Sequence, residues 1–237
     1  MEFEFKPLFE NHDTGVGELG EEIVADLFSD IYSKKSNGKK VKDNINNIYN
    51  PFFKQHNIKA NEFDLLQGRD PLESFLNGNK NEPLALLTKD EIKIIRATRS
   101  RKRQKGSRID YVQDSLANRA LPFEKIKELS NPTWQQCKPL QFDWLIGIII
   151  CSDKFLGYLI KSSPELLKRM KPQHKGAIKE DGTFDEGHVL WNDKDRMKIF
   201  EFNSIQEIKD SYGKLRLQDH IDNYIPDLQK LTFVTKK

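Results

Sequence analysis

The most apolar stretch of the chain, residues 142–160, constrains the fold more than any other feature. It reads FDWLIGIIICSDKFLGYLI and is rich in β-branched residues. Such residues favour strands, and the polar pair Ser152–Asp153 offers a turn in the middle of the stretch. A short, continuously apolar strand is typical of a sheet that is covered on both faces. The sequence therefore predicts a central strand, a turn and a second strand.

Helical patterns lie on either side of these strands. Residues 15–32 carry Leu19, Ile23, Leu27 and Phe28 at helical spacing, which predicts an amphipathic helix. Further helices are expected over 121–129, over 162–170, where a Ser-Pro pair begins the segment, and over 203–212, where Ser204 and Glu207 form a capping box.

Two more strands are expected, one over 61–68 and one over 84–98, strongest from Glu91 to Ile95. Helix, strands, helix, paired strands and helices together predict an α/β (α+β) fold with a mixed central sheet flanked by helices. We expect one domain over residues 1–237, with a core of about 15–160 and a helical or irregular extension over 161–237.

Composition excludes several classes of protein. The chain has 237 residues, 37% apolar and 32% charged, so it is expected to be globular rather than disordered. The apolar run at 144–151 is too short for a membrane span, and the acidic N-terminus does not resemble a signal peptide. Cys137 and Cys151 have no His or Cys at zinc-ligand spacing. We expect a reduced, cytoplasmic protein that does not contact a membrane.

The segment KDEIKIIR, residues 89–96, places an acid and a lysine two residues apart within an Ile-rich strand. Because residues i and i+2 of a strand share a face, Glu91 and Lys93 are expected on one side. The bland interpretation is an edge strand with a solvated charged face. If the strand of Asp64 is its neighbour, however, two carboxylates and an ammonium converge. Adjacent carboxylates repel each other unless a cation lies between them, and Mg²⁺ suits such oxygen ligands.

These residues resemble the PD-(D/E)XK nucleases, which include most type II restriction endonucleases. That family has an Asp at the end of one strand and an acid-x-Lys on the next, as in FDLLQG and DEIK here. The resemblance implies a Mg²⁺-dependent endonuclease in which Asp64 and Glu91 hold the metal and Lys93 positions the attacking water. It also implies a restriction-endonuclease-like fold, a double-stranded DNA substrate, a homodimer and a possible cognate DNA methyltransferase.

Many family members carry a helix whose glutamate reaches the metal, which is similar to GELGEE at residues 17–22. At about 100° per residue, Glu21 lies beside the apolar face of the expected helix, Glu22 lies further round, and Glu18 lies nearly opposite. Glu21 is therefore the expected fourth catalytic residue, with Glu22 as the alternative.

A basic run, RATRSRKRQKGSR, follows the acid-x-Lys strand directly. It contributes seven candidate phosphate contacts: Arg96, Arg99, Arg101, Lys102, Arg103, Lys105 and Arg108. Such a run is commonly a solvated loop, but next to a phosphate-cleaving site it favours contact with a DNA backbone. Of the other candidates, Asp143 is a second possible acidic ligand, and His188 is expected to be structural.

Three functions stay open on these residues. The first is a type II restriction endonuclease that cuts duplex DNA at a short specific site. The second is a repair or recombination nuclease of the same fold that recognises DNA structure. The third is a non-catalytic DNA-binding protein whose charged strand is merely solvated.

Overall fold

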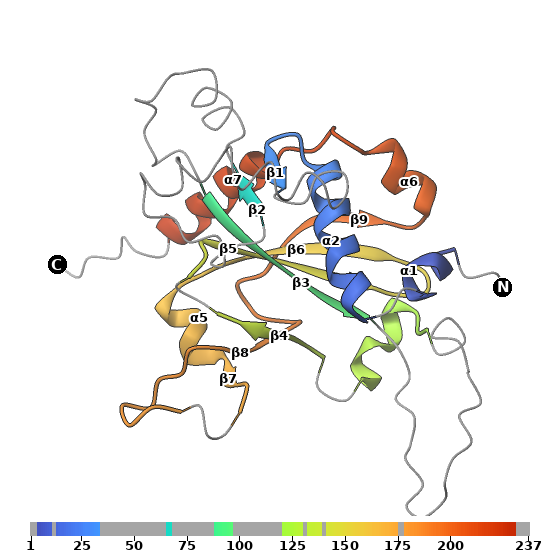
Figure 1. Cartoon of the computed structure of the whole chain (residues 1–237). Coiled ribbons are helices and arrows are strands. Elements are labelled where there is room, and N and C mark those ends of the chain that lie inside the picture. Colours follow the sequence, from blue (N-terminus) through green and yellow to red (C-terminus); the bar gives the residue numbers. More distant parts are fainter. Residues whose placement is uncertain are drawn as a thin grey trace, which may run out of the picture.

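The computed structural model describes residues 4–10, 13–33, 65–67, 88–96, 120–129, 132–138, 141–174 and 178–230. Within these ranges the chain has an α+β fold with one six-stranded and one three-stranded sheet (Figure 1). The elements in chain order are α1 (Lys6–Glu10), α2 (Asp13–Leu27), β1 (Ile31–Ser33), β2 (Leu65–Gln67), β3 (Thr88–Arg96), the 3-10 helix η3 (Phe123–Glu128), β4 (Thr133–Cys137), β5 (Trp144–Ile150), β6 (Phe155–Lys161), α5 (Pro164–Arg169), β7 (Lys171–Pro172), β8 (Gly187–Leu190), β9 (Met197–Phe202), α6 (Ile205–Asp210) and α7 (Leu217–Lys230).

The main sheet has the strand order β1-β2-β3-β5-β6-β9. β1, β2 and β3 pair antiparallel in succession, whereas β3 and β5 are parallel. The sheet ends with the antiparallel pairs β5–β6 and β6–β9. A parallel pair needs a crossover connection, and the long segment between β3 and β5 supplies it. The sheet is therefore mixed, as expected.

The predicted strand pair at 142–160 is confirmed as the β5–β6 hairpin. All seven residues of β5 are buried, because both faces of this strand are covered. The turn between the strands is closed by the Cys151 amide, which donates to the Lys154 carbonyl at 2.8 Å. The two strands form the hydrophobic centre of the molecule.

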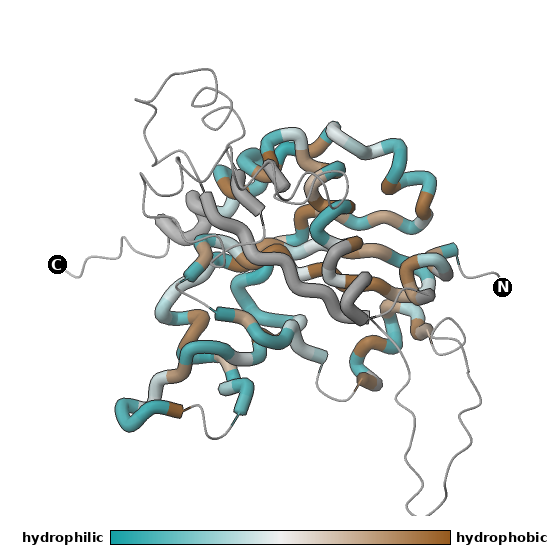
Figure 2. Tube along the Cα trace, in the orientation of Figure 1, coloured by the Kyte–Doolittle hydropathy of each residue, from teal (hydrophilic) through white to brown (hydrophobic). Residues whose placement is uncertain are grey.

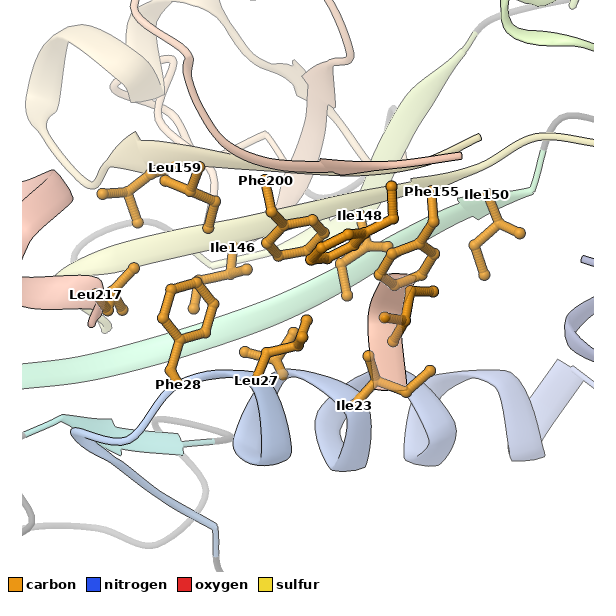
Figure 3. Close-up of a cluster of buried hydrophobic side chains, with 14 of the residues drawn as sticks. Ile23, Leu27, Phe28, Ile146, Ile148, Ile150, Phe155, Leu159, Phe200 and Leu217 are labelled. Carbon is orange, nitrogen blue, oxygen red and sulfur yellow. The ribbon is translucent and has the colours of Figure 1, made fainter. Parts of the chain in front are cut away.

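Two hydrophobic clusters cover the two faces of the main sheet. On one face, Ile146 and Ile148 of β5 pack with Ile23 and Leu27 of α2, in a cluster that also includes residues of α1, α6 and α7 (Figure 3). On the other face, Leu145 packs in a second cluster with residues of η3, α5 and the second sheet. Alternate residues of β5 therefore face opposite layers.

The second sheet is small and has the order β4-β8-β7. It lies against the face of the main sheet opposite α2 (Figure 1). Its residues are on the whole more hydrophilic than those of β5 and β6, as the hydropathy colouring shows (Figure 2). Both cysteines are buried, free thiols in the cluster between the two sheets. None of the helices in the described ranges combines the length and apolarity that a membrane span requires.

The helix expected over 15–32 is shorter than predicted, because α2 ends at Leu27. Phe28 forms a bridge with Leu215, and the chain then enters β1. The carboxylate of Asp30 accepts hydrogen bonds from the Leu217 and Gln218 amides at 2.9 and 2.8 Å, at the first turn of α7. These partners lie far away in the sequence, so the helical periodicity of 15–32 could not reveal them.

The helices predicted at 162–170 and 203–212 are confirmed as α5 and α6. Ser163 accepts a hydrogen bond from the Leu166 amide, and Ser204 accepts one from the Glu207 amide at 3.0 Å. The expected capping box differs in one detail, because the Glu207 carboxylate accepts from the amide of Asn203 rather than from that of Ser204. The helix expected over 121–129 is instead the short 3-10 helix η3, in which the Leu129 amide donates to the Ile126 carbonyl.

The segment after residue 160 contains more strand than expected. It carries β7, β8 and β9 besides α5, α6 and α7, and β9 pairs with β6 in the main sheet. Ile199 and Phe200 of β9 are buried in the cluster on the α2 face. The C-terminal segment thus completes the same sheet that carries the predicted catalytic strand.

Candidate functional site

The two strands that the sequence singles out are neighbours in the main sheet. β2 pairs antiparallel with β3, in the register Leu65 with Asp90 and Gln67 with Thr88. Asp64 itself lies outside the described residues and directly precedes Leu65. The predicted acidic site requires these two strands to be neighbours, and their described residues are paired.

β3, the strand of Glu91 and Lys93, is an internal strand. It pairs with β2 on one side and with β5 on the other. The edge position in the alternative interpretation of KDEIKIIR is therefore wrong, whereas its solvated charged face stays a prediction.

The register assigns Glu91 and Lys93 to one face of the sheet. Glu91 pairs with Leu145 and Lys93 with Gly147 in the parallel ladder between β3 and β5. Residues paired across strands share a face. Leu145 packs in the cluster with the second sheet, and Trp134 of β4 lies against Gly147. The positions of Glu91 and Lys93 therefore belong to the face that carries the second sheet.

Glu21 lies on α2, which covers the other face of the main sheet (Figure 3). Its side chain is partly exposed, and Glu22 is more exposed. The structure thus brings α2 into contact with β3, but it does not bring Glu21 to the face to which Glu91 and Lys93 are assigned. The catalytic role of Glu21 stays a prediction, and it requires an approach around an end or edge of the strand.

Arg96, the first residue of the basic run, is the last residue of β3 and pairs with Ile150 of β5. Because the two strands are parallel, the run leaves the sheet at the carboxyl ends of both. The remaining predicted DNA contacts, Arg99, Arg101, Lys102, Arg103, Lys105 and Arg108, lie outside the described residues.

Neither Asp143 nor His188 is part of β3: Asp143 directly precedes Trp144, the register partner of Asp90, and His188 belongs to the second sheet. Asp143 is exposed and precedes β5, so it is not the charged residue within a central strand that the sequence suggested. His188 of β8 shares a hydrogen bond of 3.1 Å between its Nδ1 and Thr133 Oγ1 of β4. This contact between strands of the second sheet supports a structural role for His188.

A cationic side chain, Arg196, lies on the face of the main sheet that carries the second sheet, near the edge formed by β9. The guanidinium of Arg196 lies over the rings of Tyr158 and Trp191, at 4.6 and 4.8 Å from their centroids. Nearby, the carboxylate of Glu201 accepts from Lys154 and Lys198, each at 2.7 Å. The hydrogen bond from Lys154, followed by that from Lys198, lowers the pKa of Glu201. Burial raises the pKa of Tyr158.

Among the described side chains, no group of three or more His, Cys, Asp or Glu residues has metal-binding geometry. The predicted ligands Asp64 and Glu91 do not belong to the side chains described in the structure. Their chemistry fits Mg²⁺, because carboxylate oxygens are the protein ligands that this ion prefers. The pairing of β2 with β3 is also what a cation shared between these two strands needs.

Sequence reasoning missed one feature close to the predicted site. Residues 133–137 read TWQQC, and their burial does not alternate, because Gln135 and Gln136 are both exposed between buried Trp134 and Cys137. Two successive polar residues inside a strand were the available signal of a bulge.

Comparison with known proteins identifies no relative: no family model matches this sequence, and no curated protein and no solved structure matches it.

Proposed function

We propose that the chain is a Mg²⁺-dependent DNA endonuclease of the type II restriction class, with a restriction-endonuclease-like fold. It would hydrolyse phosphodiester bonds of double-stranded DNA at a short specific site. The observation that carries the proposal is the position of Glu91 and Lys93. They lie on an internal strand that pairs with the strand directly following Asp64.

The order of elements along the chain supports the proposal. The acidic helix α2 precedes an antiparallel meander of β1, β2 and β3, and the chain then crosses over to β5, parallel to β3. The resemblance to PD-(D/E)XK nucleases calls for this combination of an acidic helix, two adjacent catalytic strands and later strands of the same sheet.

The proposal requires the β2–β3 ladder to continue by one residue, so that Asp64 stands opposite Glu91. Directly opposed residues of an antiparallel pair have Cβ atoms about 4.5–5.5 Å apart. Two carboxylates at that separation can share one divalent cation. Asp64 and Glu91 would hold Mg²⁺, which, when bound, polarises the scissile phosphate and acidifies an attacking water. The ammonium of Lys93 would orient that water and stabilise the extra negative charge at phosphorus.

The basic run would hold the DNA backbone. It begins at Arg96, the last residue of β3, whose register partner Ile150 packs in the cluster on the α2 face, so the position of Arg96 belongs to the face opposite Lys93. The basic residues that follow Arg96 in the sequence would neutralise phosphates of the bound DNA. Two-fold symmetric DNA sites suit a homodimer, and a restriction enzyme would have a cognate DNA methyltransferase as its partner.

The direct test is plasmid cleavage with Mg²⁺ by the wild type and by Glu91→Ala and Lys93→Ala. Asp90→Ala is the matched control, because it removes a neighbouring acid whose register partner, Trp144, packs in the cluster on the α2 face. We expect each of the first two variants to lose at least about a hundredfold in rate, and the control to retain cleavage. Undiminished cutting by either site variant would eliminate this site.

The DNA substrates distinguish the proposed function from its two rivals. Discrete fragments from unmodified linear duplex support sequence-specific restriction. Cleavage confined to forked or four-way junctions favours a structure-specific repair or recombination nuclease. DNA retention that is indifferent to Mg²⁺, with no strand breaks, favours a non-catalytic DNA-binding protein.

A further inference from the structure

The bulge in β4 presents two neighbouring amide side chains on the surface. The register between β4 and β8 shifts between Trp134 and Cys137, and Gln135 and Gln136 are exposed at this shift. In a regular strand only one of two successive residues would point outward. The irregularity therefore aims both glutamines at solvent.

Gln136 has a backbone conformation that is unfavourable for glutamine. Its φ of 55° lies in the left-handed region, and among the described residues no other non-glycine has a positive φ. This conformation costs a residue with a side chain about 1–2 kcal/mol. Glycine or asparagine would adopt it more readily if the backbone shape were the only requirement. The surroundings stabilise it: the Gln136 amide donates to Gln173 Oε1 at 3.2 Å, and Trp134 and Cys137 on either side are fully buried.

The bulge is close to the strand of the proposed site. β4 contacts β3 directly, and Trp134 lies against Gly147, the register partner of Lys93. Gln136 is two residues beyond Trp134 along the chain. The bulge and the register positions of Glu91 and Lys93 thus lie on the same side of the main sheet.

We propose that Gln135 and Gln136 read base edges in the major groove of the DNA that the proposed nuclease site holds. This inference rests on the proposed function and assigns its sequence specificity to a named element. A glutamine amide offers one donor and one acceptor, which match N6 and N7 of adenine as a bidentate pair. A short β-ribbon fits the major groove, and the two glutamines lie on β4, an outer strand of the three-stranded sheet β4-β8-β7. Exposed Lys138 follows the bulge directly in the chain, with the Glu186 carboxylate 4.0 Å from its ammonium, and suits a phosphate at the rim of the groove.

The test compares the wild type with a double variant, Gln135→Ala with Gln136→Gly. Glycine at position 136 keeps the left-handed backbone accessible and removes the side chain that carries the amide. Gln206→Ala on α6 is the matched control, because α6 packs on the other face of the main sheet. All three proteins are first compared by thermal unfolding, and the sequences at the cleaved ends of a large unmodified DNA are then determined.

A second arm does not depend on cleavage. The Glu91→Ala protein, with and without the glutamine substitutions, selects duplexes from a library with a randomised central stretch. We expect the double variant to lose about tenfold to a hundredfold in preference at one or two A·T pairs of the selected site. The Gln206→Ala control keeps the wild-type pattern.

The outcomes separate the two proposals. A folded double variant with the wild-type cleavage and selection pattern overturns the reading role and leaves the nuclease intact. If the wild type selects a sequence without cutting DNA, and the double variant loses that sequence, the reading role stands and the nuclease fails. A wild type that neither cuts nor selects any sequence overturns both.

Discussion

Gly147 of β5 and Trp134 of β4 are in direct contact, with the indole ring lying over the glycine backbone. A Cβ added at Gly147 would lie 2.4 Å from Cζ2 of the indole. The indole N–H also donates to the Ile148 carbonyl at 3.2 Å. This contact joins the second sheet to the main sheet at Gly147, the register partner of Lys93.

Gly147→Ala is expected to destabilise the protein by about 1–3 kcal/mol, because the methyl group overlaps a fully buried ring in a closely packed interior. Urea denaturation measures this change. The control is Gly17→Ala in α2, where an added Cβ meets nothing within 4 Å. That substitution should stabilise the helix by up to about 1 kcal/mol, and equal effects at the two glycines would contradict the contact.

Asp193→Asn is expected to cost about 2–4 kcal/mol. The Asp193 carboxylate is 5% exposed and accepts from Arg169 Nε and Nη2 at 3.0 and 2.9 Å. The hydrogen bond to Asp193 is the main cause that raises the pKa of Arg169, so the two charged groups stabilise each other. Replacing the Asp193 carboxylate by an amide removes this stabilisation from a largely buried pair. Asp195→Asn removes a more exposed carboxylate on the same arginine, and should cost less than about 1 kcal/mol. The prediction fails if thermal unfolding ranks the two variants in the reverse order.

The stability contributed by Glu201 should depend on pH. Because hydrogen bonds from Lys154 and Lys198 lower its folded pKa below the ordinary value of 4.5, its contribution is present above that value. The contribution is lost as the pH falls through the folded pKa. Glu201→Gln should therefore destabilise the protein by up to about 1 kcal/mol at neutral pH and have no effect in strong acid. The free energy of unfolding of the wild type and of Glu201→Gln is measured across the acid range. A difference between them that persists at the lowest pH would contradict this ion pair.

Cys151 should be unreactive in the folded protein. Burial, with a further contribution from Asp153, raises the pKa of its thiol from 9.0 to about 12. Since the thiolate is the nucleophile, alkylation by iodoacetamide at mildly alkaline pH should be slow until denaturant is added. Mass spectrometry of the Cys151 peptide measures the labelling. Rapid labelling in native buffer would mean that the hairpin between β5 and β6 opens readily.

Glu21→Ala should reduce DNA cleavage much less than Glu91→Ala. α2 covers the face of the sheet opposite to the register positions of Glu91 and Lys93. Glu22→Ala tests the alternative glutamate on the same helix and, for the same reason, should be close to wild type. Single-turnover cleavage rates at several Mg²⁺ concentrations provide the measurement. A loss at Glu21 as large as that at Glu91 would place the helix glutamate in the metal site.

The acid-x-Lys strand illustrates the limit of sequence reasoning at the site. Its β character and the common face of Glu91 and Lys93 followed from β-branched residues and the two-residue repeat of a strand. Its internal position did not, because pairing with β2 and β5 joins segments that are distant in the sequence. The sequence also did not reveal whether Glu91 and Lys93 lie on the face covered by α2 or on the opposite face, because that depends on the register between strands.

The sequence alone determined the features whose interactions are local. Apolar patterning produced the β5–β6 hairpin, and the hydroxyls of Ser163 and Ser204 begin α5 and α6 by bonding amides three residues away. Only the tertiary structure decided that α2 ends at Leu27, that β9 completes the main sheet and that Trp134 covers Gly147. Each of these depends on partners far along the chain. A local pattern cannot specify which distant strand or ring will supply the compensating hydrogen bonds and buried surface.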